Sequence, residues 1–204
     1  ESKLCYGFSM PLVNPIDIKD EKVKKLVNFF NETLGFCPNS VLTMQRRPAI
    51  AKAFIELNMA VMENHGDLTS EFKRLIAFVS SNTAGCRYCQ AHTIRAADRY
   101  GASKERLEKV WDFENQECFS EKERSALRFA QQASMIPVNV SELTEKELQF
   151  HWCDDDIVEI MGVIALFGYL NRWNDVMATS IEYEAEASGN NLLKGISWNV
   201  GKHT

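Results

Sequence analysis

The sequence lacks the features of membrane proteins and of nucleic-acid-binding proteins. It contains no run of roughly 18 apolar residues, the length that a membrane-spanning helix requires. It also lacks an excess of basic residues, because 23 Lys and Arg face 28 Asp and Glu, which gives a net charge of −5. Phosphate binding needs a basic surface, so we expect neither a membrane nor nucleic acid as a partner.

No secretory signal is recognisable at the start, no segment repeats and none has low complexity. The 204 residues are 45% hydrophobic and 25% charged, which is typical of a globular protein with its own core. We therefore expect a cytoplasmic protein with a single domain over residues 1–204. Residues 189–204, rich in Gly and Asn, are expected to form an irregular tail.

Strands are also absent from the prediction, because almost every segment repeats its apolar residues with the period of a helix. The predicted fold class is therefore all-α. The expected helices cover residues 20–34, 48–62, 70–79, 86–100, 103–111, 120–135 and 157–184, and a further one begins near Thr144. The last helix is the longest, and its centre reads as buried on nearly all sides.

Several predicted helix starts carry capping residues at the required spacing. Ser120 with Glu123, and Thr144 with Glu147, match the capping-box pattern, in which each side chain bonds to the backbone N–H of the other residue. The three acidic residues 154–156 favour a helix start through the helix dipole. These positions therefore predict where three of the helices begin.

The cysteines are too scattered for a disulfide scaffold in a chain of this length. They are Cys5, Cys37, Cys86, Cys89, Cys118 and Cys153. Only Cys86 and Cys89 are close in sequence. In an intracellular protein, a Cys-x-x-Cys pair indicates redox chemistry or metal binding before it indicates a structural role.

Cys86 and Cys89 lie one helical turn apart at a predicted helix start. Their Cα atoms are then roughly 5–6 Å apart, which is within the range that a disulfide allows. Free N–H groups and the helix dipole at this end favour a thiolate at Cys86, and Arg87 adds positive charge. His92 can take a proton from a thiol or give one to a leaving group. Cys86, Cys89 and His92 are therefore the predicted catalytic residues.

Two other uses of the motif are weaker. Zinc would find three ligands in Cys86, Cys89 and His92, but no second Cys pair or His pair completes a structural site. Covalent haem needs a His directly after the second Cys, where the sequence has Gln90. We therefore expect no metal and no cofactor, and inert structural thiols are the remaining alternative to a redox dithiol.

Two neighbouring runs carry a family resemblance. Residues 68–79 read Leu-Thr-Ser-Glu-Phe-Lys-Arg-Leu-Ile-Ala-Phe-Val, and residues 82–93 read Asn-Thr-Ala-Gly-Cys-Arg-Tyr-Cys-Gln-Ala-His-Thr. Together they resemble the alkylhydroperoxidase D-like branch of the carboxymuconolactone decarboxylase family. Residues 171–175, Asn-Arg-Trp-Asn-Asp, are similar to a stretch in its larger peroxidase-related members. The resemblance extends from about residue 26 to residue 177.

This resemblance implies an all-helical, oligomeric fold with a Cys-x-x-Cys at a helix N-terminus and a peroxide-reducing dithiol. By the family's pattern, Cys89 attacks the peroxide, Cys86 resolves the product into a disulfide, and a dithiol reductant protein restores the thiols. The family places its His four residues after the second Cys. This chain has Thr93 at that position, and His92 comes one position earlier.

The family's proton relay has no direct counterpart in this sequence. Its Glu lies twelve residues before the first Cys, and this chain has Arg74 at that position. Glu71 lies three residues earlier, and Glu63 and His65 lie on the preceding segment. These three are the candidates for a possible proton relay.

The predicted function is that of a thiol-dependent peroxidase, an antioxidant enzyme that reduces peroxides through a Cys86/Cys89 dithiol–disulfide cycle assisted by His92. The expected partners are a small-molecule peroxide, a dithiol reductant protein and further copies of the chain. One alternative is a carboxymuconolactone decarboxylase-like enzyme that uses His92 as a base. Another is a non-catalytic redox sensor or helical assembly protein.

Overall fold

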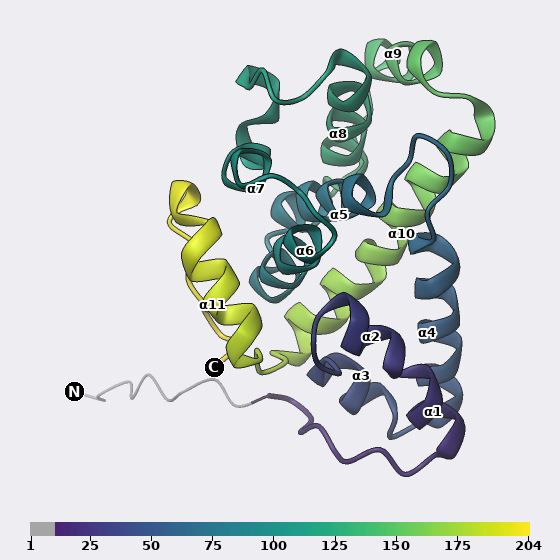
Figure 1. The fold of residues 1–204 in the computed structure, drawn as a ribbon, viewed down its shortest axis with the longest axis vertical. Helices are drawn as coiled ribbons and strands as arrows, with labels where there is room; N and C mark the ends of the chain where they lie inside the picture. Colours follow the sequence, from purple (N-terminus) through teal and green to yellow (C-terminus); the bar gives the residue numbers. More distant parts are fainter. Residues whose placement is uncertain (1–10) are drawn as a thin grey trace.

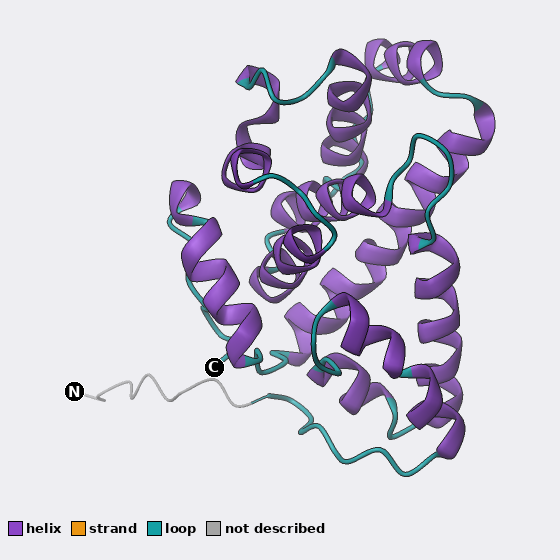
Figure 2. Ribbon diagram, in the orientation of Figure 1, coloured by secondary structure: helices purple, strands orange, loops and turns teal. Residues whose placement is uncertain are grey.

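Helices make up the architecture of the computed structural model, which describes residues 11–204 (Figure 1 and Figure 2). No residue of this described range belongs to a β-strand, which confirms the all-α prediction. Cys5 and the start of the chain, where we looked for a signal, lie outside the described residues. The α-helices are α1 (Glu21–Leu26), α2 (Asn28–Thr33), α3 (Asn39–Met44), α4 (Pro48–Met62), α5 (Ser70–Ala84), α6 (Arg87–Arg99), α7 (Lys104–Lys109), α8 (Glu121–Ala133), α9 (Glu142–His151), α10 (Asp154–Met177) and α11 (Tyr183–Leu192). Two short 3-10 helices are η1 (Val110–Asn115) and η2 (Lys194–Ile196).

Several helices begin where their capping residues predict. At the start of α5, the Thr69 hydroxyl accepts a hydrogen bond from the backbone N–H of Phe72 at 3.1 Å. Ser120 and Glu123 form the predicted capping box before α8, because each side chain accepts a hydrogen bond from the backbone N–H of the other. Each such cap is worth roughly 1 kcal/mol, which is enough to fix the first residue of a helix.

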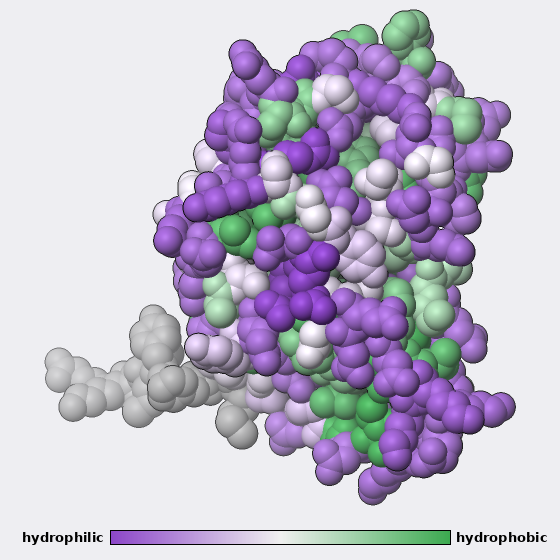
Figure 3. All heavy atoms as spheres, in the orientation of Figure 1, coloured by the Kyte–Doolittle hydropathy of each residue, from purple (hydrophilic) through white to green (hydrophobic). Residues whose placement is uncertain are grey.

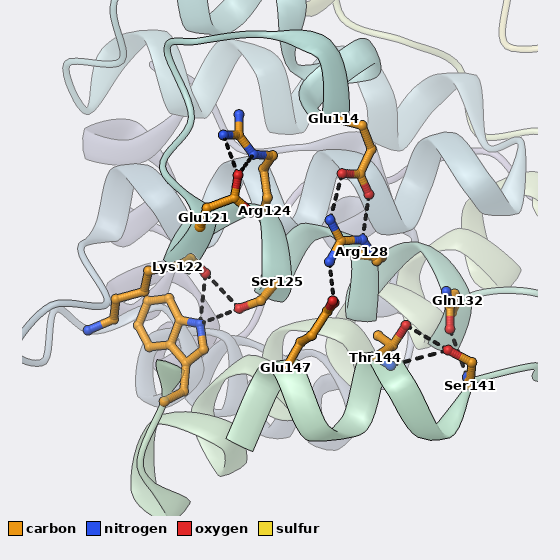
Figure 4. Close-up of polar contacts among 11 residues, drawn as sticks. Glu114, Glu121, Lys122, Arg124, Ser125, Arg128, Gln132, Ser141, Thr144 and Glu147 are labelled. Atoms are coloured by element: carbon orange, nitrogen blue, oxygen red, sulfur yellow. Dashed lines mark hydrogen bonds and ion pairs between the residues drawn. The ribbon is translucent and has the colours of Figure 1, made fainter. Parts of the chain in front are cut away.

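The capping box predicted at Thr144 is wrong. The N-cap of α9 is Ser141, whose Oγ accepts a hydrogen bond from the backbone N–H of Thr144 at 3.2 Å. Glu147 instead forms an ion pair with Arg128 of α8, and Arg128 also contacts Glu114 (Figure 4). The carboxylate that the capping box required is therefore used to join α8 to α9.

The long helices differ from the prediction at their ends. The predicted helix over residues 20–34 divides at Val27, where ψ is −14°. α10 ends at Met177 because Ala178 takes a left-handed conformation with φ 46°. Residues 189–192 were expected to be part of an irregular tail, but they belong to α11. Leu193, directly after this helix, is fully buried and anchors its end in the core.

Helices α5 and α6 form the centre of the fold. α5 packs against α6, α8 and α10, and Figure 1 shows α6 between α11 and α10. Apolar side chains with no exposed surface fill the interfaces, among them Leu75 and Phe78 of α5, Ile94 of α6 and Val163 of α10. The N-terminal end of α6 is therefore enclosed by helices from distant parts of the chain.

A buried lysine joins three of these helices. The side chain of Lys73 in α5 is 0% exposed, and its Nζ donates hydrogen bonds to the carbonyl oxygens of Val61 at 3.0 Å and Glu63 at 2.5 Å. The same nitrogen lies 2.7 Å from Glu159 Oε2 in α10. A charge this deeply buried is tolerated only when it is paired and hydrogen-bonded. Lys73 therefore fixes α5 against the end of α4 and against α10.

The surface on view in Figure 3 is mostly hydrophilic, and apolar side chains gather low in the view around α1 to α3. Large apolar side chains are exposed at Leu57, Phe150 and Tyr183, among others. In the part of the chain that the structure describes, no helix combines the length and the apolar character needed to cross a membrane.

Candidate active site

The turn between α5 and α6 positions the two cysteines of the motif. Gly85 ends α5 with φ 76°, a left-handed conformation that glycine adopts without strain. Cys86 follows as the extended N-cap residue of α6, and Cys89 is the third residue of that helix. The Cys-x-x-Cys motif therefore lies at a helix N-terminus, as predicted.

Cys86 and Cys89 are buried free thiols, 0% and 2% exposed, and their sulfurs have different neighbours. Asn174 of α10 donates a hydrogen bond from Nδ2 to Cys89 Sγ at 3.4 Å, and Cys89 also lines a cavity. Cys86 Sγ lies within 4.8 Å of ligand-type atoms of Asp175 and His203. The dithiol therefore separates a cavity beside Cys89 from a buried polar group beside Cys86.

Burial raises the pKa of the Cys89 thiol well above its ordinary value, and the hydrogen bond and charge of Cys86 act in the same direction. The amide of Asn174 acts to lower this pKa but does not offset the loss of water. The sulfur expected to attack the substrate is therefore protonated near pH 7 in the reduced protein. Desolvation outweighs the helix dipole at this sulfur.

His92 is held at both ring nitrogens by acceptors. Its Nδ1 lies 2.7 Å from the carbonyl oxygen of Tyr88, and its Nε2 lies 2.7 Å from Glu182 Oε2. The ring of Tyr88 stacks on the imidazole at 3.9 Å. A carbonyl and a carboxylate can only accept, so both ring nitrogens of His92 donate when Glu182 is ionised. His92 then has no free lone pair for the base role that a decarboxylase-like enzyme would require.

Glu182 completes the polar network around His92. Its Oε1 accepts hydrogen bonds from the Tyr88 hydroxyl at 2.9 Å and from the backbone N–H of Asn39. Burial acts to raise the pKa of Glu182, but the charge and hydrogen bond of His92 and the N–H of Asn39 outweigh it and hold the pKa below its ordinary value. Glu182 is therefore an ionised, buried carboxylate that keeps a proton on His92.

Sequence reasoning missed Glu182. It falls within the stretch that the helical period predicts as the end of one long helix, and 90 residues separate it from His92. The left-handed turn at Ala178 ends α10 and directs the chain back toward α6. No local pattern in the sequence signals this contact, because a single acidic residue after an apolar helix is commonplace.

The three relay candidates lie elsewhere. Glu71 Oε1 accepts a hydrogen bond from Arg106 Nε at 3.0 Å. Glu63 and His65 form an ion pair at 3.7 Å with both side chains more than half exposed, at 68% and 52%. None of these three residues lines the cavity beside Cys89. The structure therefore does not bring these three residues to the thiols. Glu71 is paired with Arg106, and Glu63 and His65 are exposed to solvent.

The cavity beside Cys89 is mostly apolar and small, with a volume of about 70 Å³. Four phenylalanines from α2, α4 and α10 line it: Phe29, Phe30, Phe54 and Phe167. Its polar lining includes His92 and Arg74, and Arg74 stands where the family pattern has a Glu. The apolar lining and the contact with one of the two sulfurs are features of a site for a small organic molecule.

A second histidine lies behind Cys86. His203 donates from Nδ1 to the carbonyl oxygen of Thr179 at 2.9 Å, and its Nε2 has no hydrogen-bond partner among the described residues. Burial lowers the pKa of His203, although the hydrogen bond to Thr179 and the charge of Asp175 act to raise it. The imidazole of His203 is therefore neutral near pH 7, with a free lone pair on Nε2.

One group of three side chains in the described part of the chain could hold a metal ion, because its possible ligand atoms lie within 4.8 Å of one another. The group consists of Cys86, Asp175 and His203. Asp175 is already in an ion pair with Lys202 at 2.9 Å. A metal on Cys86 would also occupy the sulfur that the sequence analysis assigns to a disulfide with Cys89. We therefore assign no metal to this group.

The chain belongs to the carboxymuconolactone decarboxylase family. Residues 48–132, which include both helices around the motif, match the carboxymuconolactone decarboxylase family. The structure of the debrominase Bmp8 is 31% identical with a TM-score of 0.82, over 89% of this chain and 97% of that chain. A cysteine-to-alanine variant of Bmp8 in complex with 2,3,4-tribromopyrrole has the same TM-score. The peroxidase-related protein of Ralstonia eutropha JMP134, an alkylhydroperoxidase AhpD core, has the same fold.

The Ralstonia protein is 22% identical with a TM-score of 0.72, over 85% of this chain and 94% of that chain, so this likeness concerns the fold alone. The protein YnjA of Escherichia coli K12 is 31% identical over 93 residues, 45% of this chain. That match spans about half the length of YnjA, 50%. The same helical fold is thus found in a debrominase and in a peroxidase-related protein.

Proposed function

We propose that the protein is a dithiol-dependent reductase of organic hydroperoxides. The position of Cys89 carries this proposal, because its sulfur lines an apolar cavity while Cys86 lies one helical turn away. A substrate in the cavity meets one thiol, and the second thiol is close enough in sequence to close a disulfide. The peroxidase-related members of the family support the same chemistry.

In the first half-reaction, the Cys89 sulfur attacks one oxygen of the hydroperoxide. An S–O bond forms and the O–O bond breaks, so Cys89 becomes a sulfenic acid and the substrate leaves as an alcohol. The sulfur is oxidised by two electrons and the peroxide is reduced by the same two. The proton that leaves the thiol is balanced by the proton that the departing alkoxide takes up.

His92 and Glu182 supply that proton. His92 is a donor at both nitrogens, and the Glu182 carboxylate 2.7 Å from Nε2 stabilises its charged form. A proton donor next to the cavity lowers the barrier to O–O cleavage, because the leaving alkoxide is neutralised as it forms. To act as the general acid, His92 turns one N–H from its acceptor, the Tyr88 carbonyl or Glu182, toward the leaving oxygen. The proton that leaves the Cys89 thiol then returns to that nitrogen.

In the second half-reaction, the Cys86 sulfur attacks Cys89. The S–S bond forms, the S–O bond breaks, and the oxygen leaves as water after it takes up the Cys86 proton. No outside oxidant is needed for this step. A dithiol reductant protein then reduces the disulfide by thiol–disulfide exchange and restores both thiols.

Reductive removal of bromine from a small aromatic ring is the second candidate. The similarity to Bmp8 favours it, at 31% identity over 97% of that chain, and so does the phenylalanine lining of the cavity. In this reaction the Cys89 sulfur takes the bromine while the ring carbon takes a proton. Cys86 then displaces bromide and forms the same disulfide, so the dithiol again supplies both electrons.

The test of the proposal is the consumption of cumene hydroperoxide with dithiothreitol as the reductant. We expect Cys89→Ser to lose activity by roughly a hundredfold or more, since the attacking sulfur is gone. Cys86→Ser should gain one oxygen on Cys89, detected by mass spectrometry, and then stop. Cys153→Ser, at an exposed thiol outside the site, is the control and should match the wild type. Equal rates for the wild type and Cys89→Ser would overturn the proposal.

The same proteins, incubated with 2,3,4-tribromopyrrole and dithiothreitol, separate the two candidates. Release of bromide by the wild type but not by Cys89→Ser, without consumption of hydroperoxide, would favour the debrominase. Two expectations accompany either candidate: a cytoplasmic location, where thiols stay reduced, and a homo-oligomer in solution. Light scattering of the purified protein measures the second.

A further inference from the structure

Arg74 of α5 is a buried cation in the wall of the cavity. The residue is 3% exposed, and it lines the same cavity as Cys89 and His92. Its Nη1 donates a hydrogen bond to the carbonyl oxygen of Ser70 at 2.6 Å, and its guanidinium lies over the ring of Tyr100 at 3.5 Å. Neither contact supplies a negative charge, and no ion pair joins Arg74 to an Asp or Glu in the described part of the chain.

An unpaired guanidinium inside a protein is unfavourable. Burial lowers the pKa of Arg74 to about 10, which still leaves it charged at pH 7. The described cavity lining contains no Asp or Glu, and the charge of His92 is balanced by Glu182 behind it. Arg74 is therefore the uncompensated charge of the cavity wall. Buried arginines of this kind are normally matched by a carboxylate or a phosphate.

We propose that Arg74 binds the carboxylate of the substrate, so that the protein acts on apolar hydroperoxides that carry an acidic group. This inference rests on the proposed reductase function and names its substrate class. The apolar part of such a molecule occupies the space between Phe30, Phe54 and Phe167. With the carboxylate on Arg74, the peroxide end of a molecule of suitable length meets Cys89 in the same cavity.

The place of Arg74 in the sequence agrees with a role in binding the substrate and not in proton transfer. The family pattern described above has a relay Glu at this position, and in this chain Glu182 holds the histidine instead. The position twelve residues before Cys86 is thus not needed for proton transfer. A cation there changes what the cavity binds and leaves the acid–base pair untouched.

Binding is tested without any redox step. Isothermal titration calorimetry compares 3-phenylpropionate with its neutral amide, 3-phenylpropionamide, on the reduced wild type. We expect the carboxylate to bind roughly tenfold or more tightly than the amide, because an arginine–carboxylate pair forms away from water. Arg74→Gln should abolish this preference, and Arg74→Lys should keep part of it. Arg46→Gln, at an exposed arginine, is the matched control and should keep all of it.

Turnover is tested with a matched pair of peroxides, cumene hydroperoxide and the same molecule with a carboxylate at the para position of its ring. We expect Arg74→Gln to raise the KM for the carboxylated peroxide roughly tenfold or more and to leave cumene hydroperoxide nearly unchanged. A structural role of Arg74 would affect both peroxides alike. Arg74→Met should melt no lower than the wild type, because the substitution removes an unpaired buried charge.

The outcomes separate this inference from the proposed function. Equal binding of 3-phenylpropionate and its amide, or an unchanged preference in Arg74→Gln, would overturn the carboxylate site. A similar loss for both peroxides in Arg74→Gln and Arg74→Met, with a lower melting temperature, would do the same. Selective binding of the carboxylate with no turnover of either peroxide would support the site and refute the peroxidase.

Discussion

Glu182 Oε2 lies 2.7 Å from His92 Nε2, although 90 residues separate the two in the sequence. His92 is on the helix that carries the motif, and Glu182 follows the turn at the end of α10. The other oxygen of the same carboxylate accepts a hydrogen bond from the Tyr88 hydroxyl, so both carboxylate oxygens are held by hydrogen bonds. This contact joins the C-terminal part of the chain to the proposed chemistry.

Replacing Glu182 by Gln tests whether its charge acts on His92. The amide keeps the size of the side chain but removes the negative charge that stabilises the charged imidazole. We expect kcat for cumene hydroperoxide to fall roughly 10- to 100-fold with little change in KM. Glu184→Gln, at an exposed carboxylate two residues away, is the control. Unchanged kcat in Glu182→Gln, with a normal circular dichroism spectrum, would show that the pair has no catalytic role.

The stability of the protein in acid should depend on the same carboxylate. Burial acts to raise the pKa of Glu182, but His92 and the N–H of Asn39 hold it below its ordinary value. A lowered folded-state pKa stabilises the fold above the unfolded pKa of about 4.3, and this contribution is lost as pH falls through the folded pKa. We expect the free energy of unfolding in urea to fall in that window, and less steeply in Glu182→Gln. Parallel curves for the two proteins would contradict the assignment.

The reactivity of the thiols should reflect their burial. The raised pKa of Cys89 leaves little thiolate at pH 7, and its sulfur is also shielded from reagents. We expect iodoacetamide to label the exposed Cys153 first at pH 7, and the rate at Cys89 to rise as the pH is raised toward and above 9. Peptide mapping by mass spectrometry follows each site. Faster labelling of Cys89 than of Cys153 at pH 7 would refute the raised pKa.

Disulfide closure should depend on His203. The imidazole is neutral near pH 7, its Nε2 has no hydrogen-bond partner among the described residues, and one of its ring nitrogens lies within 4.8 Å of Cys86 Sγ. We therefore expect His203 to accept the Cys86 proton as that sulfur attacks. Asp175, Lys202, Tyr88, His92 and Thr179 are the other groups around its ring. His203→Asn keeps a donor for the Thr179 carbonyl and removes the basic ring nitrogen. Closure should then slow roughly tenfold at pH 7.

Closure is measured as the release of the second thionitrobenzoate after one equivalent of Ellman's reagent, with all cysteines outside the motif changed to serine. This phase is intramolecular and needs no peroxide, so it is independent of the substrate. The difference between the wild type and His203→Asn should shrink at high pH, where Cys86 ionises without help. His65→Asn, at an exposed histidine, should behave as the wild type. An equal slowing at every pH would indicate a structural role instead.

The parts of the site that are local in sequence could be predicted from it. Gly85 followed by Cys86 and Cys89 defines a helix end, a turn and a new helix start within five residues, and each step follows from backbone preferences. The capping box at Ser120 was predictable for the same reason. At Thr144 the spacing was right but the prediction failed, because an ion pair across two helices used Glu147.

The parts that depend on tertiary contacts could not be predicted. Glu182 and His203 reach the motif through the turn at Ala178, a non-glycine residue in a left-handed conformation that no local pattern signals. The raised pKa of Cys89 could not be predicted either, because burial cannot be read from the spacing of residues. The relay candidates Glu71 and Glu63 were chosen by proximity along the chain, which does not measure distance in the fold.

The turn at Ala178 also bears on how such proteins diverge. The carboxylate that contacts His92, Glu182, comes from the segment after α10 and not from the two helices on either side of the cysteines. Changes in the length or angle of that segment can therefore replace the acid while the thiols stay where they are. Because the carboxylate lies there, position 74 on α5 need not carry it, and a substitution at that position can change what the cavity binds without altering the two cysteines or His92.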